Sequence, residues 1–187
     1  FQHGQENAQH FKNLADTGYK ALAELRDNKI VKAIGLGVNE NQVCLDALEI
    51  GSWDVFLVAG RYTLLEQTAL DELFPACSKR ETSIICGGPF NSGILVGREM
   101  WNYAKAPQTI IEKANALRKV ADEFNIPLAA AALQFPQANK IVSSVIPGPR
   151  SKDELLEILK WQKVKIPAEF WNSLKERKLL RADAPTP

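Results

Sequence analysis

Two glycine-rich segments of the sequence carry groups that suit an anionic ligand. The run 87–93 reads Gly-Gly-Pro-Phe-Asn-Ser-Gly, and its glycines let a ligand approach the backbone without a Cβ atom in the way. We expect this run to leave several backbone N–H groups free, with Asn91 and Ser92 adding polar contacts, as a pyrophosphate site requires. The run 147–151 reads Pro-Gly-Pro-Arg-Ser, in which Arg150 could bind a phosphate through two hydrogen bonds or stack on adenine. Tight turns also need glycines, so either segment alone is weak support for a site.

Three further residues follow predicted strands and are candidates for ligand contacts. Asn39 comes after the first strand, and we expect it to cap the next helix as well. Tyr62 follows the second strand and is a candidate substrate contact, with packing in the core wall as the alternative. Arg61, beside it, either faces the mouth of the site or pairs with Glu66.

The elements that must position these residues begin with four apolar runs. Their centres are almost continuously apolar, which is typical of strands buried on both faces of a parallel sheet. Ligands of parallel α/β folds gather at the carboxyl ends of the strands, where all the residues above lie. The predicted strands are Ile30 to Gly37, Asp54 to Gly60, Thr82 to Gly88 and Ile141 to Gly148.

Helical patterns alternate with these strands, which predicts right-handed parallel βαβ units. The last two helices begin with Ser151 at the cap position and with Pro167 at the first helical position. An open doubly wound sheet and part of a closed barrel both fit this order. The predicted helices are 14–26, 39–50, 70–78, 108–124, 127–135, 151–161 and 168–179.

Composition and charge exclude several classes of function. The 23 basic and 22 acidic residues give a net charge of +1, so the sequence does not predict a nucleic-acid partner. No apolar run is long enough for a membrane span. The 3 cysteines have no close partner in sequence, which favours a reducing compartment and a cytoplasmic location. His3 and His10 lie far from every cysteine, so no metal site is predicted, and both are typical of surface histidines.

Length and the first residues predict part of a longer protein. The chain has 187 residues, whereas a complete eight-unit βα barrel needs about 250. The sequence begins Phe-Gln-His-Gly-Gln, with neither an initiator Met nor a signal-peptide pattern. A partial barrel would expose apolar groups at two open sheet edges, so we expect self-association or marginal stability.

Five motifs together resemble the second half of the aldo-keto reductases. The similarity covers nearly the whole chain and is greatest to the branch that holds D-threo-aldose 1-dehydrogenase and L-fucose dehydrogenase, with pyridoxal 4-dehydrogenase nearby. Any one motif is weak, but five in register are specific. They are Ala33 to Asn39, Gly60 to Leu65, Gly87 to Leu95, Ala131 to Phe135 and Val145 to Ser151.

The resemblance implies an α/β fold of the (β/α)8 TIM-barrel type. This chain would supply about the last four βα units plus extra helices, with residues 1–187 forming the C-terminal part of one barrel domain. Members of the family bind NAD(P) and move a hydride, and their proton-transfer residues lie on the first four strands. No position here matches those residues, so we assign no catalytic residue.

The cofactor side of the family is what this chain matches. The resemblance implies that the run 88–93 wraps the pyrophosphate, that Pro147, Gly148 and Arg150 cradle the adenosine end, and that Asn39 binds the cofactor amide. The predicted cofactor-binding residues are Asn39, Gly88, Pro89, Phe90, Asn91, Ser92, Gly93, Pro147, Gly148, Arg150 and Glu154.

Departures from the family pattern favour NAD as the cofactor, with NADP as the alternative. Gly148 and Glu154 stand where relatives that prefer NADP carry cations, and a carboxylate repels a 2′-phosphate. Gly87 replaces an aromatic residue that stacks on the nicotinamide, and Ile158 replaces an Asn near adenine.

The leading hypothesis is an NAD(P)-dependent oxidoreductase that oxidises an aldose at C1. This chain would be part of that enzyme, and we expect it to be inactive by itself. A non-catalytic interaction or channel-associated subunit is the alternative. A phosphate-binding aldolase or isomerase is a weaker third reading, because Lys29 and Lys32 flank a strand and do not end it.

Overall fold

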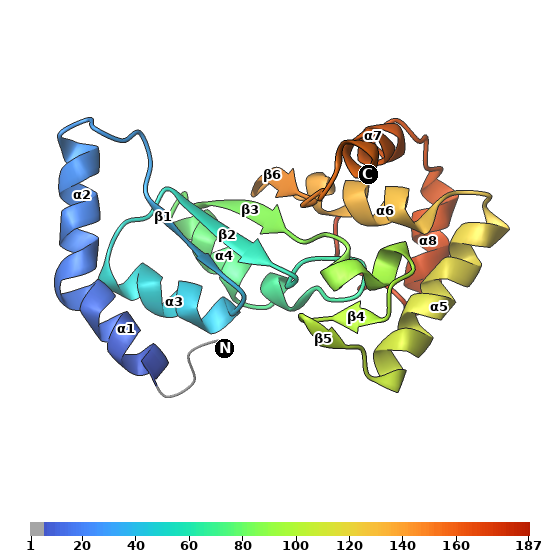
Figure 1. The fold of residues 1–187 in the computed structure, drawn as a ribbon, viewed down its shortest axis with the longest axis horizontal. Helices are drawn as coiled ribbons and strands as arrows, with labels where there is room; N and C mark the ends of the chain where they lie inside the picture. The colour runs from blue at the N-terminus through green and yellow to red at the C-terminus, as the bar shows by residue number, and fades with distance from the viewer. Residues whose placement is uncertain (1–5) are drawn as a thin grey trace.

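A four-stranded parallel sheet forms the centre of the computed structural model, which describes residues 6–187 (Figure 1). The strand order is β1-β2-β3-β6, and the three pairings are all parallel. Ala59 pairs with Gly87, and Gly87 pairs with Ile146, so the carboxyl ends of the strands meet at one edge. The strands are β1 (Gly35–Val38), β2 (Val55–Ala59), β3 (Ser83–Gly87) and β6 (Val142–Ile146).

Helices follow each strand, as the alternating sequence pattern predicts. Figure 1 shows α3 and α4 beside the sheet, with α5, α6 and α8 grouped beyond its carboxyl ends. Their bounds are α1 (Asn7–Asn13), α2 (Tyr19–Asp27), α3 (Asn41–Ile50), α4 (Leu73–Lys79), α5 (Gln108–Glu123), α6 (Leu128–Gln134), α7 (Lys152–Trp161) and α8 (Ala168–Glu176). Shorter turns are the π-helical η2 (Leu14–Gly18) and the 3-10 helices η3 (Thr68–Leu70), η4 (Asn91–Val96) and η5 (Phe135–Ala138).

The core is continuous between the sheet and these helices. Alternate residues of β2 and β3 are fully buried, including Phe56 and Ile84, and α6 is buried on nearly all sides, as its alanine-rich sequence predicts. Phe135, Phe170 and Trp171 extend the core towards the C-terminus. This buried apolar area fixes the direction of β2 and β3 and therefore where their carboxyl ends point.

Several element boundaries differ from the expectations. The first strand begins at Gly35 and not at Ile30, because the chain first turns after α2: Lys29 has a φ of 61° and Ile30 is 69% exposed. The first helical stretch begins earlier, at Asn7, and continues through the π-helical turn η2 into α2. Pro167 is the N-cap of α8, one position before the helix begins.

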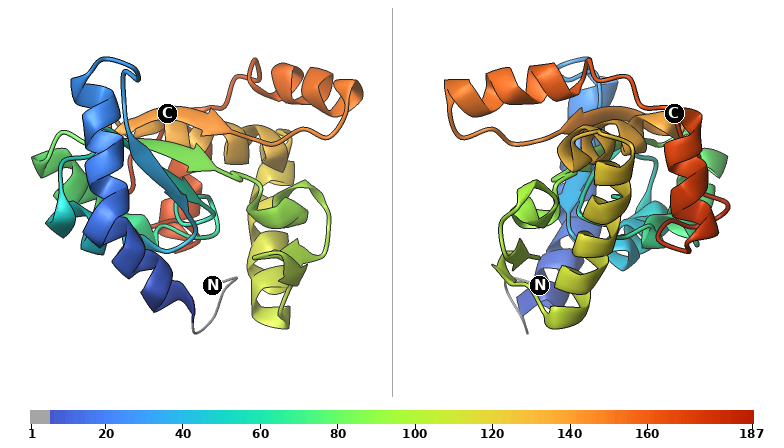
Figure 2. Two further views of the ribbon diagram at one scale, coloured as in Figure 1. Left: turned by 60° about the vertical axis from the view of Figure 1, so that its left-hand side comes forward. Right: turned by 90° about the vertical axis from the view of Figure 1, so that its right-hand side faces the viewer.

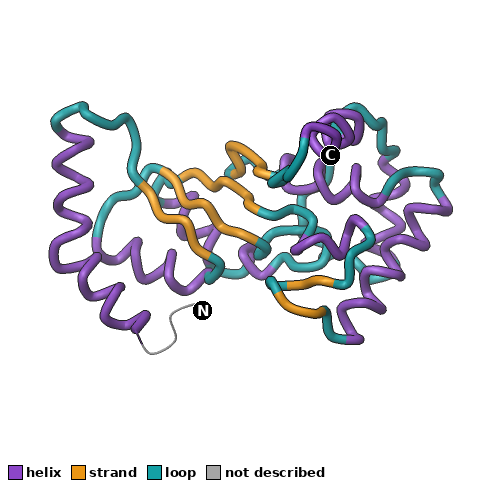
Figure 3. Tube along the Cα trace, viewed as in Figure 1, coloured by secondary structure: helices purple, strands orange, loops and turns teal. Residues whose placement is uncertain are grey.

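A short hairpin that the sequence did not predict lies between η4 and α5. Its strands are β4 (Met100–Trp101) and β5 (Ala104–Lys105), which pair antiparallel. The two residues at its tip, Asn102 and Tyr103, have φ values of 48° and 65°, as a two-residue type I′ turn requires. Figure 3 shows the hairpin as two short strands beside the long helix α5.

The two outer strands of the sheet each have a single partner among residues 6–187. These are β1 and β6, and Figure 2 shows α7 extending away from the sheet beyond β6. Leu155, Leu156 and Leu159 of α7 are 44–50% exposed. Self-association through these edges stays a prediction. Within the described residues, no helix has the length and apolar character needed to cross a membrane.

Candidate functional site

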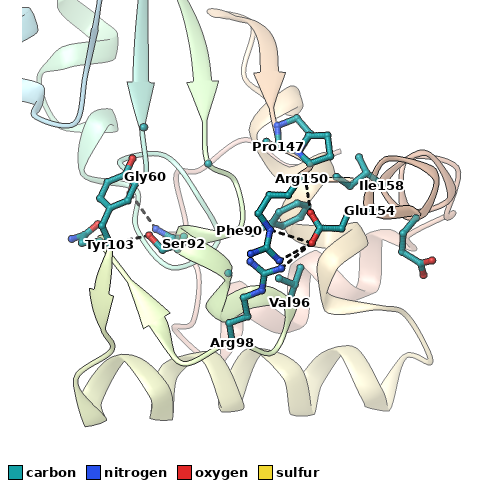
Figure 4. Close-up of a pocket in the computed structure, with 18 of the residues that line it drawn as sticks. Gly60, Phe90, Ser92, Val96, Arg98, Tyr103, Pro147, Arg150, Glu154 and Ile158 are labelled. Atoms are coloured by element: carbon teal, nitrogen blue, oxygen red, sulfur yellow. Dashed lines mark hydrogen bonds and ion pairs between the residues drawn. The ribbon is translucent and has the colours of Figure 1, made fainter. Parts of the chain in front are cut away.

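A pocket of about 540 Å³ opens at the carboxyl ends of the strands (Figure 4). This volume falls within the range of small-molecule and cofactor sites, about 300–1,000 Å³. Its walls come from the loops after β1, β2, β3 and β6, from the hairpin tip and from one side of α7. The lining residues are Asn39, Ala59, Gly60, Gly88, Phe90, Asn91, Ser92, Gly93, Val96, Arg98, Asn102, Tyr103, Pro147, Gly148, Pro149, Arg150, Glu154, Glu157, Ile158 and Trp161.

The pocket brings together most of the residues that the sequence singled out. Two of the predicted site residues, Pro89 and Tyr62, do not line it. Those that do are Asn39, Gly88, Phe90, Asn91, Ser92, Gly93, Pro147, Gly148, Arg150 and Glu154.

Tyr62 is the clearest correction. Its side chain is 2% exposed and packs between Phe74 and Phe135, with ring centroids 4.8 and 5.0 Å away. Burial raises the pKa of its hydroxyl to about 12. The prediction that Tyr62 contacts a substrate is therefore wrong, and its alternative as part of the core wall is the one observed.

The loop after β3 is less open than expected. The N–H of Gly88 donates to the Ile146 carbonyl at 3.0 Å, that of Asn91 to Gly88, and that of Gly93 to Phe90. The expectation of several free N–H groups therefore fails for these three, because the loop folds back into the 3-10 helix η4. Gly88 still offers an open surface, since a Cβ atom placed there would meet nothing within 4 Å, and its φ of +59° favours glycine.

Asn91 is a support for the loop and offers little surface to a ligand. It is 2% exposed, and its Nδ2 donates to the Gly60 carbonyl at 3.3 Å. Its Oδ1 accepts a hydrogen bond from the Thr63 hydroxyl, which is also buried. These bonds tie the loop after β3 to the end of β2 and compensate for the left-handed backbone of Asn91.

The α7 end of the pocket holds two guanidinium groups around one carboxylate. Oε1 of Glu154 accepts from Arg150 Nη2 at 2.8 Å and from Arg98 Nη2 at 3.0 Å, and its Oε2 accepts from the Arg150 backbone N–H at 2.7 Å (Figure 4). The side-chain and backbone hydrogen bonds from Arg150 lower the pKa of Glu154 to about 2, with the charge of Arg98 adding to the effect. Ser151 caps α7, as predicted, by accepting from the Glu154 N–H at 3.2 Å.

An apolar wall lies next to these charges. Phe90 and Trp161 meet edge to face with ring centroids 5.6 Å apart, and Ile158 of α7 is 8% exposed beside them. A planar aromatic ligand can bury its faces against such a wall while the guanidinium groups contact an attached anion.

The opposite end of the pocket is polar and carries amides. The expectation that Asn39 caps α3 is wrong, since the N-cap is Glu40, and Asn39 lines the pocket. Its Nδ2 donates to the Ala59 carbonyl at 3.4 Å and to the Tyr103 hydroxyl at 3.3 Å. The N–H of Tyr103 in turn donates to Ser92 Oγ at 3.0 Å, so the hairpin tip joins the loops after β1 and β3.

Sequence reasoning missed several lining residues. Nothing in the sequence pointed to Arg98. Its side chain packs against Gly93, where a Cβ atom would lie 2.7 Å from it, and this contact can be seen only in the structure. Asn102 and Tyr103 lie on the unpredicted hairpin, and Trp161 lies at the last position of α7.

The arrangement suits binding more directly than proton transfer. The pocket offers cations and an apolar wall at one end, an open glycine in the middle and amides at the other end, which matches an extended dinucleotide. Among the described residues, no cluster of three or more His, Cys, Asp or Glu could hold a metal ion.

Comparisons with known proteins give the same family throughout. The profile of the Aldo/keto reductase family matches residues 8–178. The chain is 43% identical over 167 residues to pyridoxal 4-dehydrogenase of Microbacterium luteolum, covering 87% of this chain and 49% of that protein. It is 34% identical over 176 residues to D-threo-aldose 1-dehydrogenase of a Pseudomonas species, covering 91% of this chain and 52% of that protein. The chain thus spans about half the length of these relatives.

Solved structures confirm the fold. An aldo-keto reductase from Bacillus halodurans, in its holo form, superimposes with a TM-score of 0.67 at 21% identity, covering 88% of this chain and 56% of that one. The glycerol dehydrogenase of Gluconobacter oxydans gives a TM-score of 0.66 at 15% identity, covering 94% and 57%. At these identities the likeness concerns the fold alone, and it agrees with a partial TIM barrel.

Proposed function

Because this chain belongs to the Aldo/keto reductase family, we propose that its pocket binds NAD in an extended form and serves an oxidoreductase. The observation that carries the proposal is the single pocket in which Gly88, Arg150 and Asn39 come together from three separate strand ends. The adenosine part would lie against Phe90 and Trp161, the pyrophosphate near Gly88, and the nicotinamide amide near Asn39.

The residues present fit this cofactor in two respects. Gly88 leaves open space where a side chain would stand in the way of a phosphate. Arg98 and Arg150 supply planar donors for an anion at the start of α7. When bound, the nicotinamide supplies hydride chemistry, and the protein groups bind and orient it.

Glu154 supports a preference for NAD over NADP. Arg98 and Arg150 both donate to its carboxylate, so both guanidinium groups already have an anionic partner. Glu157, which pairs with Lys160, adds a second carboxylate to the same end of the pocket. A 2′-phosphate would have to break these bonds and approach the carboxylates. NAD carries no such phosphate and avoids this repulsion.

The substrate we propose is an aldose that is oxidised at C1. D-threo-aldose 1-dehydrogenase is a relative by sequence, and the chain is also similar to pyridoxal 4-dehydrogenase, at higher identity. A pyridoxal-like aldehyde is therefore the second candidate. Both substrate types carry an aldehyde that an internal hydroxyl can close into a cyclic hemiacetal, so one reaction class covers both.

Calorimetric titration of the 187-residue chain tests the proposal. We expect NAD and ADP-ribose to bind, and NADP to bind more weakly than NAD. Glu154→Gln should improve NADP binding relative to NAD by about tenfold, because it removes one negative charge and releases two guanidinium groups. Absence of binding by both NAD and ADP-ribose at millimolar concentration would overturn the proposal.

Turnover by the same chain is a second test. Because the family resemblance assigns no position of this sequence to the family's proton-transfer residues, we propose that NAD binds without oxidation of L-fucose or pyridoxal. NADH formation by the purified chain, followed by absorbance at saturating NAD, would show that this part of the proposal is wrong.

A further inference from the structure

Arg61 is a partly buried arginine that does not line the pocket, yet two of its three hydrogen-bond partners, Asn39 and Asn102, do line it. Its side chain is 17% exposed. Its Nε donates to the Asn39 carbonyl at 2.7 Å, and its Nη2 donates to Asn102 Oδ1 at 2.8 Å. Its Nη1 completes the set with an ion pair to Glu66 at 2.6 Å.

These contacts join three segments that are far apart in the sequence. Arg61 follows β2, Asn39 follows β1, and Asn102 lies at the tip of the hairpin, 41 residues further along the chain. The planar guanidinium fixes the directions of all three bonds at once, which an ammonium group could not do. Arg61 therefore sets the position of the strand end relative to the hairpin tip.

The hairpin tip in turn holds the side chain of Asn39. Tyr103 is the second residue of the tip, and its hydroxyl accepts from Asn39 Nδ2 at 3.3 Å. In Figure 4, Tyr103 and Ser92 lie on one side of the pocket, well away from Arg150 and Glu154. Arg61 thus restrains Asn39 twice, through its carbonyl directly and through its side chain by way of the tip.

We propose that Arg61 is a positioning residue for the nicotinamide end of the bound cofactor, acting through Asn39 and the hairpin tip. The inference rests on the proposed binding of NAD and goes beyond it by assigning a role to a residue outside the pocket. It restricts that role to one half of the ligand. ADP-ribose contains the adenosine and pyrophosphate but lacks the nicotinamide, so its binding should not depend on Arg61.

Arg61→Lys tests this directly, with Arg26→Lys as a matched control. Arg26 is also largely buried, at 21% exposure, and it also binds one carboxylate and one backbone carbonyl, those of Asp54 and Ser52. Arg26 lies on α2 and reaches the amino end of β2 through Asp54, whereas Arg61 follows the carboxyl end of the same strand. The two substitutions therefore make the same chemical change at opposite ends of the sheet.

Calorimetric titrations with NAD and with ADP-ribose give the readout. We expect Arg61→Lys to weaken NAD binding about tenfold, as the loss of directed charged hydrogen bonds implies, and to change ADP-ribose binding less than about twofold. Arg26→Lys should leave both affinities within about twofold. Equal weakening of both ligands by Arg61→Lys, or unchanged NAD binding, would overturn the inference.

A second variant keeps the test decisive if Arg61→Lys does not fold. Asn102→Ala removes the contact to the hairpin tip but leaves the ion pair between Arg61 and Glu66, and we expect NAD binding to weaken about threefold with ADP-ribose unchanged. Unchanged NAD binding in this variant would count against the inference. If the unsubstituted chain binds neither ligand, the proposed function itself fails, which is a different outcome.

Discussion

The amino end and the carboxyl end of β2 differ in how tightly the residues next to the strand are packed. Before the strand, Trp53 is 2% exposed, its indole N–H donates to the Ala47 carbonyl at 2.8 Å, and the Tyr19 ring packs against it with centroids 5.1 Å apart. After the strand, Gly60 lies open to the pocket. The amino end is closed by packing, whereas the carboxyl end keeps a cavity.

Left-handed backbone at non-glycine residues occurs in two settings, after helices and around the pocket. Eight non-glycine residues among those described have positive φ, and four of them follow the ends of helices. The other four, Asn91, Ser92, Asn102 and Tyr103, all line the pocket. Such conformations cost about 1–3 kcal/mol each and persist only where surrounding contacts hold them. The packed amino end of β2 therefore stabilises the fold, whereas the strained residues around the pocket lower its stability at the end where a ligand can bind.

The largest expected effect is at the closed end. Trp53→Ala should lower the free energy of unfolding by about 3–5 kcal/mol, because it empties a fully packed site. Trp161→Ala, on the pocket wall, should cost clearly less, since Trp161 is only partly buried. Urea denaturation measures both. A loss for Trp161→Ala as large as that for Trp53→Ala would break the comparison.

Two glycines offer the next largest contrast. A Cβ atom at Gly51 would lie 2.0 Å from the Tyr19 ring, so Gly51→Ala should displace that ring and cost about 1–3 kcal/mol. At Gly88 there is open space, so Gly88→Ala should cost only about 1 kcal/mol for its positive φ but should weaken NAD binding. Thermal unfolding and NAD titration of both variants measure these effects. Loss of NAD binding in Gly51→Ala but not in Gly88→Ala would contradict the expected contrast.

A smaller effect is expected at the cap of α7. Ser151→Ala removes the acceptor for the Glu154 N–H, and we expect a loss of about 1 kcal/mol in urea denaturation. Lys152→Ala, at the next and exposed position, is the control and should stay within about 0.5 kcal/mol of the unsubstituted chain. Equal effects of the two substitutions would show that the cap contributes nothing.

The smallest effect is a titration at the open end. Because its pKa is lowered to about 2 from 4.5, Glu154 stays ionised at pH 4, and its contribution to stability is present above pH 4.5 and lost as the pH falls through about 2. Carbon NMR of its carboxyl group should show this midpoint, and Arg150→Gln should move the midpoint back towards the ordinary value. A midpoint near 4.5 in the unsubstituted chain would contradict the charged network.

The sequence predicted what depends on repeating patterns. Apolar runs located β2, β3 and β6, and the helical pattern over 108–124 located α5, because a parallel sheet and an amphipathic helix impose those patterns on long segments. Glycines and polar residues after the strands located most of the pocket, since the carboxyl ends of parallel strands must meet at one edge.

What the sequence did not predict depends on contacts between distant segments. The strands β4 and β5 have two residues each, too short for any periodicity, so the hairpin and its tip were missed. For Tyr62 the sequence left two readings, a core wall or a substrate contact, because a residue after a strand can face either way, and only its packing against Phe74 and Phe135 decides between them. The sequence left Arg61 between facing the mouth of the site and pairing with Glu66, and the structure shows the pair with Glu66 together with hydrogen bonds to Asn39 and Asn102.

Hydrogen–deuterium exchange of the 187-residue chain with and without saturating NAD tests the central claim most directly, that the carboxyl end of the sheet is the binding end. We predict slower exchange in residues 88–98 and 147–154, two segments that contribute many of the pocket-lining residues, and no change in residues 51–54 at the closed end. Protection centred on residues 51–54, or spread equally over both ends, would contradict the account.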